Sequence, residues 1–183
     1  EAAIRTLLAK HGATLDPEPA AVRADGIEVP ADWAALRSAE TYVGYERTAN
    51  FASPDGLTGD GARTYEVPPT LALDQWALRG QWIVGPQAAV SIAADGQIVY
   101  RFHARDLHLV LASPIGGRAR FRVRLDGRPP GADHGVDVDA NGFGTLTEPR
   151  LYQLIRQAGR ISDRTFEITF LDAGAGAYAF TFG

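Results

Sequence analysis

The chain has 183 residues, a formal net charge of -4 and no cysteine. Without cysteine, this sequence has no disulfide, no thiolate metal site and no thiol nucleophile for thiol–disulfide exchange. The acidic net charge is atypical of nucleic-acid-binding domains, which are strongly basic. No apolar run approaches the ~20 residues of a membrane-spanning helix, so we expect neither a nucleic-acid partner nor a membrane segment within this sequence.

Residues 1–12 are predicted to form a short amphipathic helix. Ile4, Leu7 and Leu8 follow helical spacing, and Gly12 stands where a C-terminal cap belongs. Three turns are too few for an isolated helix to be stable. We therefore expect this helix to be the end of a preceding domain. The chain, which contains no methionine, is expected to be part of a longer polypeptide.

Residues 13–40 are predicted to be a linker. Pro17, Pro19 and Pro30 stand there among alanine and acidic residues. The folded domain is expected to begin at residue 41, where this composition rich in proline, alanine and acidic residues ends.

Residues 41–183 are predicted to form an all-β domain. Short alternating segments are separated by Gly, Pro and Asp-Gly. In 118–125, four arginines alternate with Ala, Phe, Val and Leu, and 177–182 places Tyr178 with two phenylalanines on its apolar side. Roughly eight or nine strands of this kind predict an antiparallel, jelly-roll-like β-sandwich, preceded by one short N-terminal helix.

Two of these strands are predicted to form a hairpin that turns at Ala104 and Arg105. In this register Phe102 faces Leu107 and every pair on that side is apolar. A slip by one residue would mix polar and apolar side chains, so the pattern favours this register. The opposite side of the hairpin would gather four polar residues, namely Arg101, His103, Asp106 and His108.

This polar set has several interpretations. A His/Asp/His group can bind zinc, and His103 with Asp106 can act as a general base and its orienting carboxylate. No serine, cysteine or further ligand is tied to the set by spacing, which favours a solvated outer face. The same side chains are also suitable hydrogen-bonding partners for a polyol.

The stretch from Asp137 to Gly142, followed by Glu148, matches the pattern of an EF-hand calcium loop. The context disagrees, because prolines precede the loop and Pro149 follows it, which excludes the flanking helices. A β-hairpin with an Asn-Gly turn is therefore favoured. The alternative is an isolated calcium ion, with the ligands Asp137, Asp139, Asn141 and Glu148.

The arginines from Arg118 to Arg124 lie about 7 Å apart along one face of their strand. Such a ladder can bind an anionic polymer or a lipid surface. It can also protect an exposed strand from aggregation by charge, and this second interpretation is favoured.

Exposed aromatic rings would favour carbohydrate binding, because sugars present flat C–H faces to them. Trp82 and Tyr100 are assigned to the core. For Tyr45, Tyr65 and Tyr152 the sequence leaves core and surface open.

Three stretches carry a resemblance to a known family. They are ETYVGYER at 40–47, YRFHARDLHL at 100–109, and HGVDVD at 134–139 with PRLYQL at 149–154. They resemble the C-terminal ectodomain of DipZ-type proteins, which are similar to the DsbD/CcdA electron transporters. Proteins of this type have a membrane domain, a thioredoxin-like domain and a sandwich module that resembles carbohydrate-binding modules. The likeness covers nearly the whole chain.

The resemblance implies an extracytoplasmic location, with membrane anchoring through a part of the parent protein outside this sequence. Residues 1–12 would be the last helix of the thioredoxin-like domain, and the redox C-x-x-C pair would lie upstream. This chain is then expected to be a non-catalytic accessory module without a cofactor. It would bind a saccharide or envelope glycan next to the redox domain of the same parent chain. The alternative is a structural or protein-interaction module that positions the redox domain without binding sugar.

The resemblance supplies no binding motif, so the candidate ligand-binding residues come from the physical interpretation alone. They are Arg101, His103, Asp106, His108, Asp137, Arg150 and Tyr152.

Overall fold

A computed structural model describes residues 26–183 of the chain. The helix expected at residues 1–12 and the first part of the linker expected at 13–40, namely residues 13–25, lie outside this part. Within it the only helix is the three-residue 3₁₀ turn Gly131–Asp133, and no helix there has the length and apolarity to cross a membrane. The prediction of an all-β, antiparallel fold is confirmed.

The strands follow one another along the chain with short connections. Their bounds are β1 (Thr41–Tyr42), β2 (Ala62–Tyr65), β3 (Trp76–Val84), β4 (Ala89–Ser91), β5 (Gly96–Phe102), β6 (Asp106–Ala112), β7 (Ala119–Leu125), β8 (Phe143–Leu146), β9 (Arg150–Arg156), β10 (Arg164–Phe170) and β11 (Gly176–Phe182).

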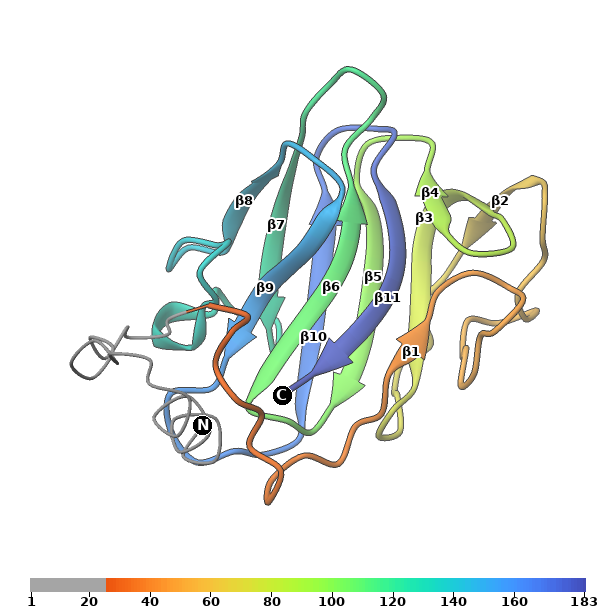
Figure 1. Cartoon of the computed structure of the whole chain (residues 1–183). Helices are drawn as coiled ribbons and strands as arrows, with labels where there is room; N and C mark the ends of the chain where they lie inside the picture. Colours follow the sequence, from red (N-terminus) through yellow and green to blue (C-terminus); the bar gives the residue numbers. More distant parts are fainter. Residues whose placement is uncertain (1–25) are drawn as a thin grey trace, which may run out of the picture.

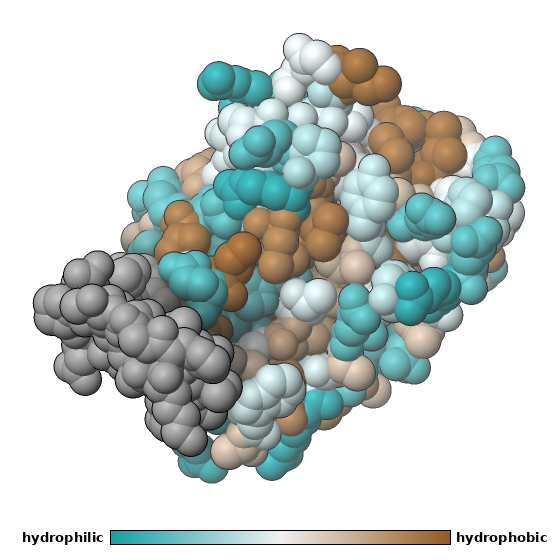
Figure 2. Space-filling model, viewed as in Figure 1, coloured by the Kyte–Doolittle hydropathy of each residue, from teal (hydrophilic) through white to brown (hydrophobic). Residues whose placement is uncertain are grey.

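All strands join one continuous sheet in the order β8-β7-β10-β5-β3-β4-β11-β6-β9, with β1 attached to β11 and β2 to β3. Figure 1 shows that the sheet curls, so that β9, β6 and β11 lie in front of β7, β10 and β5. The two halves therefore face one another. The front half, seen in Figure 2, exposes apolar patches among polar side chains.

The core lies between these two halves and is rich in aromatic rings. Phe180 of β11 contacts Tyr100 of β5 at 4.9 Å and Phe166 of β10 at 6.1 Å between ring centroids. Phe121 of β7 contacts Tyr152 of β9 edge to face, at 6.4 Å between ring centroids. Successive side chains of a strand point to opposite faces, so each half of the sheet also has an outer face, and on β6 even the outer residues Asp106 and His108 are buried.

The predicted hairpin between β5 and β6 is wrong. β5 pairs with β10 and β3, whereas β6 pairs with β11 and β9. The residues Tyr100, Phe102, Leu107 and Leu109 are all buried, as predicted, but they meet across the core and not within one sheet. The polar side chains of β5 and β6 consequently project from opposite outer faces.

Strand β3 belongs to both halves of the sheet. Its first part, Trp76–Arg79, pairs with β5, and its last part, Trp82–Val84, pairs with β4. Gly80 lies between the two and has a φ of 87°, a left-handed conformation that disfavours side chains. A Cβ there would also lie 3.4 Å from the Cα of Gly96. The strand therefore changes partners at its one left-handed glycine.

We predict that Gly80→Ala destabilises the domain by roughly 1 to 3 kcal/mol, because alanine must adopt a strained φ. Urea denaturation followed by tryptophan fluorescence measures the change. Gly159→Ala is the matched control, since no positive φ is recorded for Gly159 and the space around its Cβ is open. Equal stability of both variants would contradict a strained backbone at Gly80.

Candidate functional site

The four polar residues predicted to share one face are separated in the structure. Arg101 and His103 lie at the end of β5, where His103 Nδ1 is 2.6 Å from Asp163 Oδ1 and Arg101 Nη2 is 3.5 Å from Asp163 Oδ2. Asp106 and His108 belong to β6 in the opposite half of the sheet. A His/Asp/His zinc set or a His103–Asp106 pair is therefore not assembled.

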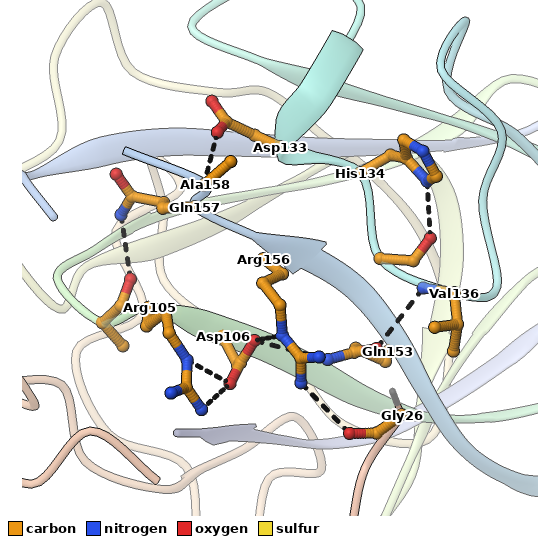
Figure 3. A network of polar contacts seen from close by, with 12 residues as sticks. Gly26, Arg105, Asp106, Asp133, His134, Val136, Gln153, Arg156, Gln157 and Ala158 are labelled. Atoms are coloured by element: carbon orange, nitrogen blue, oxygen red, sulfur yellow. Dashed lines mark hydrogen bonds and ion pairs between the residues drawn. The ribbon is translucent and has the colours of Figure 1, made fainter. Parts of the chain in front are cut away.

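Asp106 is a buried carboxylate, 1% exposed, held by two arginines (Figure 3). Arg105 Nη2 donates to Asp106 Oδ2 at 2.6 Å, and Arg156 Nε donates to Asp106 Oδ1 at 2.6 Å. The same arginines also bind the N-terminal segment, which comprises the described residues 26–40 ahead of β1. Arg105 donates to the Pro30 carbonyl at 2.7 Å and Arg156 to the Gly26 carbonyl at 3.1 Å.

The backbone of Asp106 also pairs with the last residue of the chain. The Asp106 N–H donates to the Gly183 carbonyl at 2.8 Å, and the Gly183 N–H donates to the Asp106 carbonyl at 3.2 Å. Asp106 thus links β6 to the described N-terminal segment and to the C-terminus. These contacts occupy both carboxylate oxygens, which indicates a structural role for a residue predicted to bind ligand.

His108 is 8% exposed and lies two residues along β6 from Asp106. Its Nε2 is buried and has no hydrogen-bond partner among the described residues. Burial lowers the pKa of His108, while the neighbouring Asp106 opposes the shift. The imidazole is therefore kept neutral inside the fold and is not accessible to a ligand.

The predicted calcium ligands are engaged in local structure. Arg150 Nη2 donates to Asp137 Oδ1 at 2.6 Å, and Asp139 Oδ1 accepts from the N–H groups of Asn141 and Phe143. The side chain of Glu148 is largely exposed. In residues 26–183 no group of three or more His, Cys, Asp or Glu side chains is arranged to hold a metal ion.

The aromatic residues that the sequence left open are mostly structural. Tyr65 and Tyr152 are buried in the core, as are Trp76 and Trp82. Arg150 covers the ring of Tyr152 at 3.8 Å. None of these rings lines an open aromatic surface.

A different pair of tyrosines borders a hollow on the half of the sheet that carries β1 and β11. The hollow has a volume of about 290 Å³. Tyr42 and Tyr178 form its aromatic walls. The guanidinium carbon of Arg47 lies over the Tyr42 ring, 3.6 Å from the ring centroid. The polar residues Glu46 and Gln87 complete the lining, together with Pro86 and Ala179.

A β-bulge turns Tyr178 toward this hollow. The register of β11 against β6 shifts between Ala177 and Ala179, so Tyr178 is the extra residue. Tyr178 is consequently 38% exposed, although the sequence pattern placed it with the buried Phe180. Bulges change the direction of one side chain in this way. A single-sequence pattern contains no signal for it.

The opposite wall of the hollow depends on a close backbone approach at Gly44. A Cβ at this position would lie 2.3 Å from the carbonyl carbon of Gln87, so no other residue fits without displacement. Glu46 donates its N–H to the Pro86 carbonyl at 3.0 Å. The loop that carries Glu46 and Arg47 is thereby fixed against the loop that carries Gln87.

Comparisons with known proteins cover the whole chain. Residues 38–183 match the family described as "Thioredoxin like C-terminal domain". Proteins named "Protein DipZ" from Mycobacterium bovis and Mycobacterium tuberculosis are 29% identical over 185 aligned positions, which include 100% of this chain. The chain spans 23% of the length of these relatives. The resemblance to DipZ-type proteins is confirmed.

We predict that Asp106→Asn destabilises the domain by about 3 kcal/mol, because two partly buried arginines lose their buried counter-charge. Asp172→Asn, which breaks the exposed pair with Arg120, serves as the control and should have a much smaller effect. Urea denaturation with unchanged m-values measures both. Similar losses in the two variants would show that burial of the Asp106 pair is unimportant.

We also predict that acidification from pH 7.5 to pH 5.5 destabilises the folded chain partly through His108. The pKa of His108 is lowered on folding. Below about pH 6.5, the ordinary pKa of histidine, the unfolded state therefore binds more protons than the folded state, and the stability decreases as the pH is lowered. His108→Gln should flatten this dependence. His103 lowers the pKa of Asp163 and Arg120 lowers the pKa of Asp172, so both carboxylates stay ionised in this range. Parallel profiles for wild type and variant would refute the prediction.

Proposed function

The chain belongs to the thioredoxin-like C-terminal domain family, and from this membership we propose that it is a non-catalytic, saccharide-binding accessory module of a thiol–disulfide electron-transfer protein. Without cysteine it carries no thiol chemistry of its own. The redox pair would lie in another part of the parent protein. The module would act by holding or orienting that redox domain outside the cytoplasm, with membrane anchoring through the parent.

The observation that carries the saccharide part of the proposal is the hollow between Tyr42 and Tyr178. The exposed ring of Tyr178 offers apolar contact to the C–H face of a sugar while its hydroxyl stays hydrated, whereas one face of the Tyr42 ring is covered by Arg47. Glu46 accepts hydrogen bonds, Arg47 donates them and Gln87 does both, which matches the hydroxyl groups of a saccharide. The volume of about 290 Å³ is at the lower end for small-molecule sites and suits one or two sugar rings.

The curled sheet is consistent with this role. We interpret its two facing halves as a jelly-roll-like sandwich of the kind found in carbohydrate-binding modules. In this frame Tyr42 and Tyr178 replace the residues that the sequence favoured, because Asp106 and Asp137 are paired with arginines and His108 is buried. Arg101 is partly exposed and His103 is mostly buried, and both pair with Asp163.

The alternative function is a protein-interaction module that positions the redox domain without binding sugar. One observation favours it. Trp33 is 79% exposed on the N-terminal segment, and that segment is fixed to the sheet through Arg105 and Arg156. An exposed tryptophan on a fixed segment suits a protein contact.

We predict that neutral oligosaccharides at millimolar concentration shift the amide resonances of the residues around Tyr42 and Tyr178 in NMR titrations. Tyr178→Ala should weaken binding about tenfold, since one aromatic contact contributes around 1.4 kcal/mol. Trp33→Ala removes another exposed aromatic ring and is the matched control, with unchanged affinity. Absence of shifts across a panel of saccharides would reject sugar binding and leave the interaction module.

A further inference from the structure

The outer face of the half-sheet formed by β7, β10, β5 and β3 carries a row of polar side chains. Arg122 of β7 pairs with Thr169 of β10, Thr169 with Gln97 of β5, and Gln97 with Arg79 of β3. Residues that pair directly across antiparallel strands project from the same face. At the usual strand spacing the two arginines at the ends of this row are about 14 Å apart.

Protection of a sheet edge does not explain these arginines. β7 pairs with β8 on one side and β10 on the other, so it is not an edge strand. Arg120 is bound by both carboxylate oxygens of Asp172. Arg122 and Arg124 have no ion pair within residues 26–183. The guanidinium carbon of Arg122 lies 5.2 Å from the Phe143 ring centroid, and its Nε is buried without a hydrogen-bond partner in that part of the chain.

A groove of about 440 Å³ lies on the same face. Its wall is the segment Val67–Leu71, which includes two prolines. Its floor is formed by polar side chains and one valine, namely Arg79, Gln97, Val99, Arg101, Thr165 and Glu167. The row described above crosses this floor and continues onto β7.

The charge of this face is opposite to that of the chain. Four arginines, at positions 79, 101, 122 and 124, share this face with the carboxylates Glu167 and Asp163, whereas the whole sequence has a net charge of -4. Arg101 also contacts Asp163 at the end of the groove. A guanidinium group only donates hydrogen bonds and prefers carboxylates, while threonine and glutamine both donate and accept, as sugar hydroxyls do.

We propose that this arginine face, defined by Arg79, Gln97, Arg101, Arg122, Arg124, Thr165, Glu167 and Thr169, binds an acidic polysaccharide whose sugar units carry carboxylates. The carboxylates contact the arginines, and the hydroxyls contact threonine and glutamine between them. The inference rests on the proposed saccharide-binding function but uses a second surface, because the hollow at Tyr42 and Tyr178 lies on the other half of the sheet.

An acidic peptide fits this surface less well. Its backbone cannot add to the sheet here, because β10 and β5 are hydrogen-bonded on both sides and strand addition needs a free edge. A glutamate-rich chain supplies carboxylates for the arginines but no hydroxyls for Thr165, Thr169 and Gln97. The floor of hydroxyl and amide groups therefore favours a glycan.

The test is isothermal titration of the 183-residue chain with polygalacturonate, dextran and poly-L-glutamate at low and high salt. We expect polygalacturonate to bind at least tenfold more tightly than the other two polymers, and added salt to weaken it. The double variant R79Q/R124Q should lose at least tenfold in affinity. The control R63Q/R160Q removes the same charge from exposed positions elsewhere and should stay within twofold of wild type.

The failures of this inference and of the proposed function are distinguishable. Poly-L-glutamate binding as tightly as polygalacturonate would overturn the choice of a glycan. The arginine face would be overturned if polygalacturonate did not bind, or if both double variants lost the same affinity for it. In that case the proposed function would still hold if a neutral oligosaccharide bound to the wild-type chain and did not bind to Tyr178→Ala. Polygalacturonate binding that survives Tyr178→Ala but not R79Q/R124Q supports the second surface.

Discussion

The fold depends on one strand that serves two sheet halves. β3 leaves β5 and joins β4 at Gly80, where only a residue without a side chain takes the observed φ without strain. This change of partner curls the sheet and closes the core around Tyr100 and Phe180. It also separates the two outer surfaces. The tyrosine hollow and the arginine face can therefore contact different groups at the same time.

Much of the fold could be predicted from alternation alone. The burial of Trp82 and Tyr100 follows directly from it. The pairing of β5 with β6 was predicted wrongly for a physical reason. Alternation specifies which side chains of a strand are inside, but strands that pair within a sheet and strands that face each other across a core have the same inside residues. Only contacts distant in sequence, such as the pairing of β5 with β10 and of β6 with β11, distinguish the two arrangements.

The candidate site was less predictable, because it depends on local irregularity and on distant partners. Tyr178 is exposed because of a one-residue bulge, and a bulge does not alter composition or spacing. Asp106 was expected at the surface, as aspartate usually is. It is buried because Arg156, far along the chain, and its neighbour Arg105 neutralise it. The alternation of arginines along β7 was apparent from the sequence. Their interpretation as protection of an exposed strand does not hold, because β8 pairs with β7 and covers its edge.

The arrangement around Asp106 has a mechanical consequence. Its two arginines hold the carbonyls of Gly26 and Pro30, and its backbone pairs with Gly183. Tension applied ahead of Gly26 is thus shared among β6, β9 and β11 and does not peel a single strand. The carbonyls of Gly26 and Pro30 are therefore anchored at two separate points, through Arg105 beside the first residue of β6 and through Arg156, the last residue of β9.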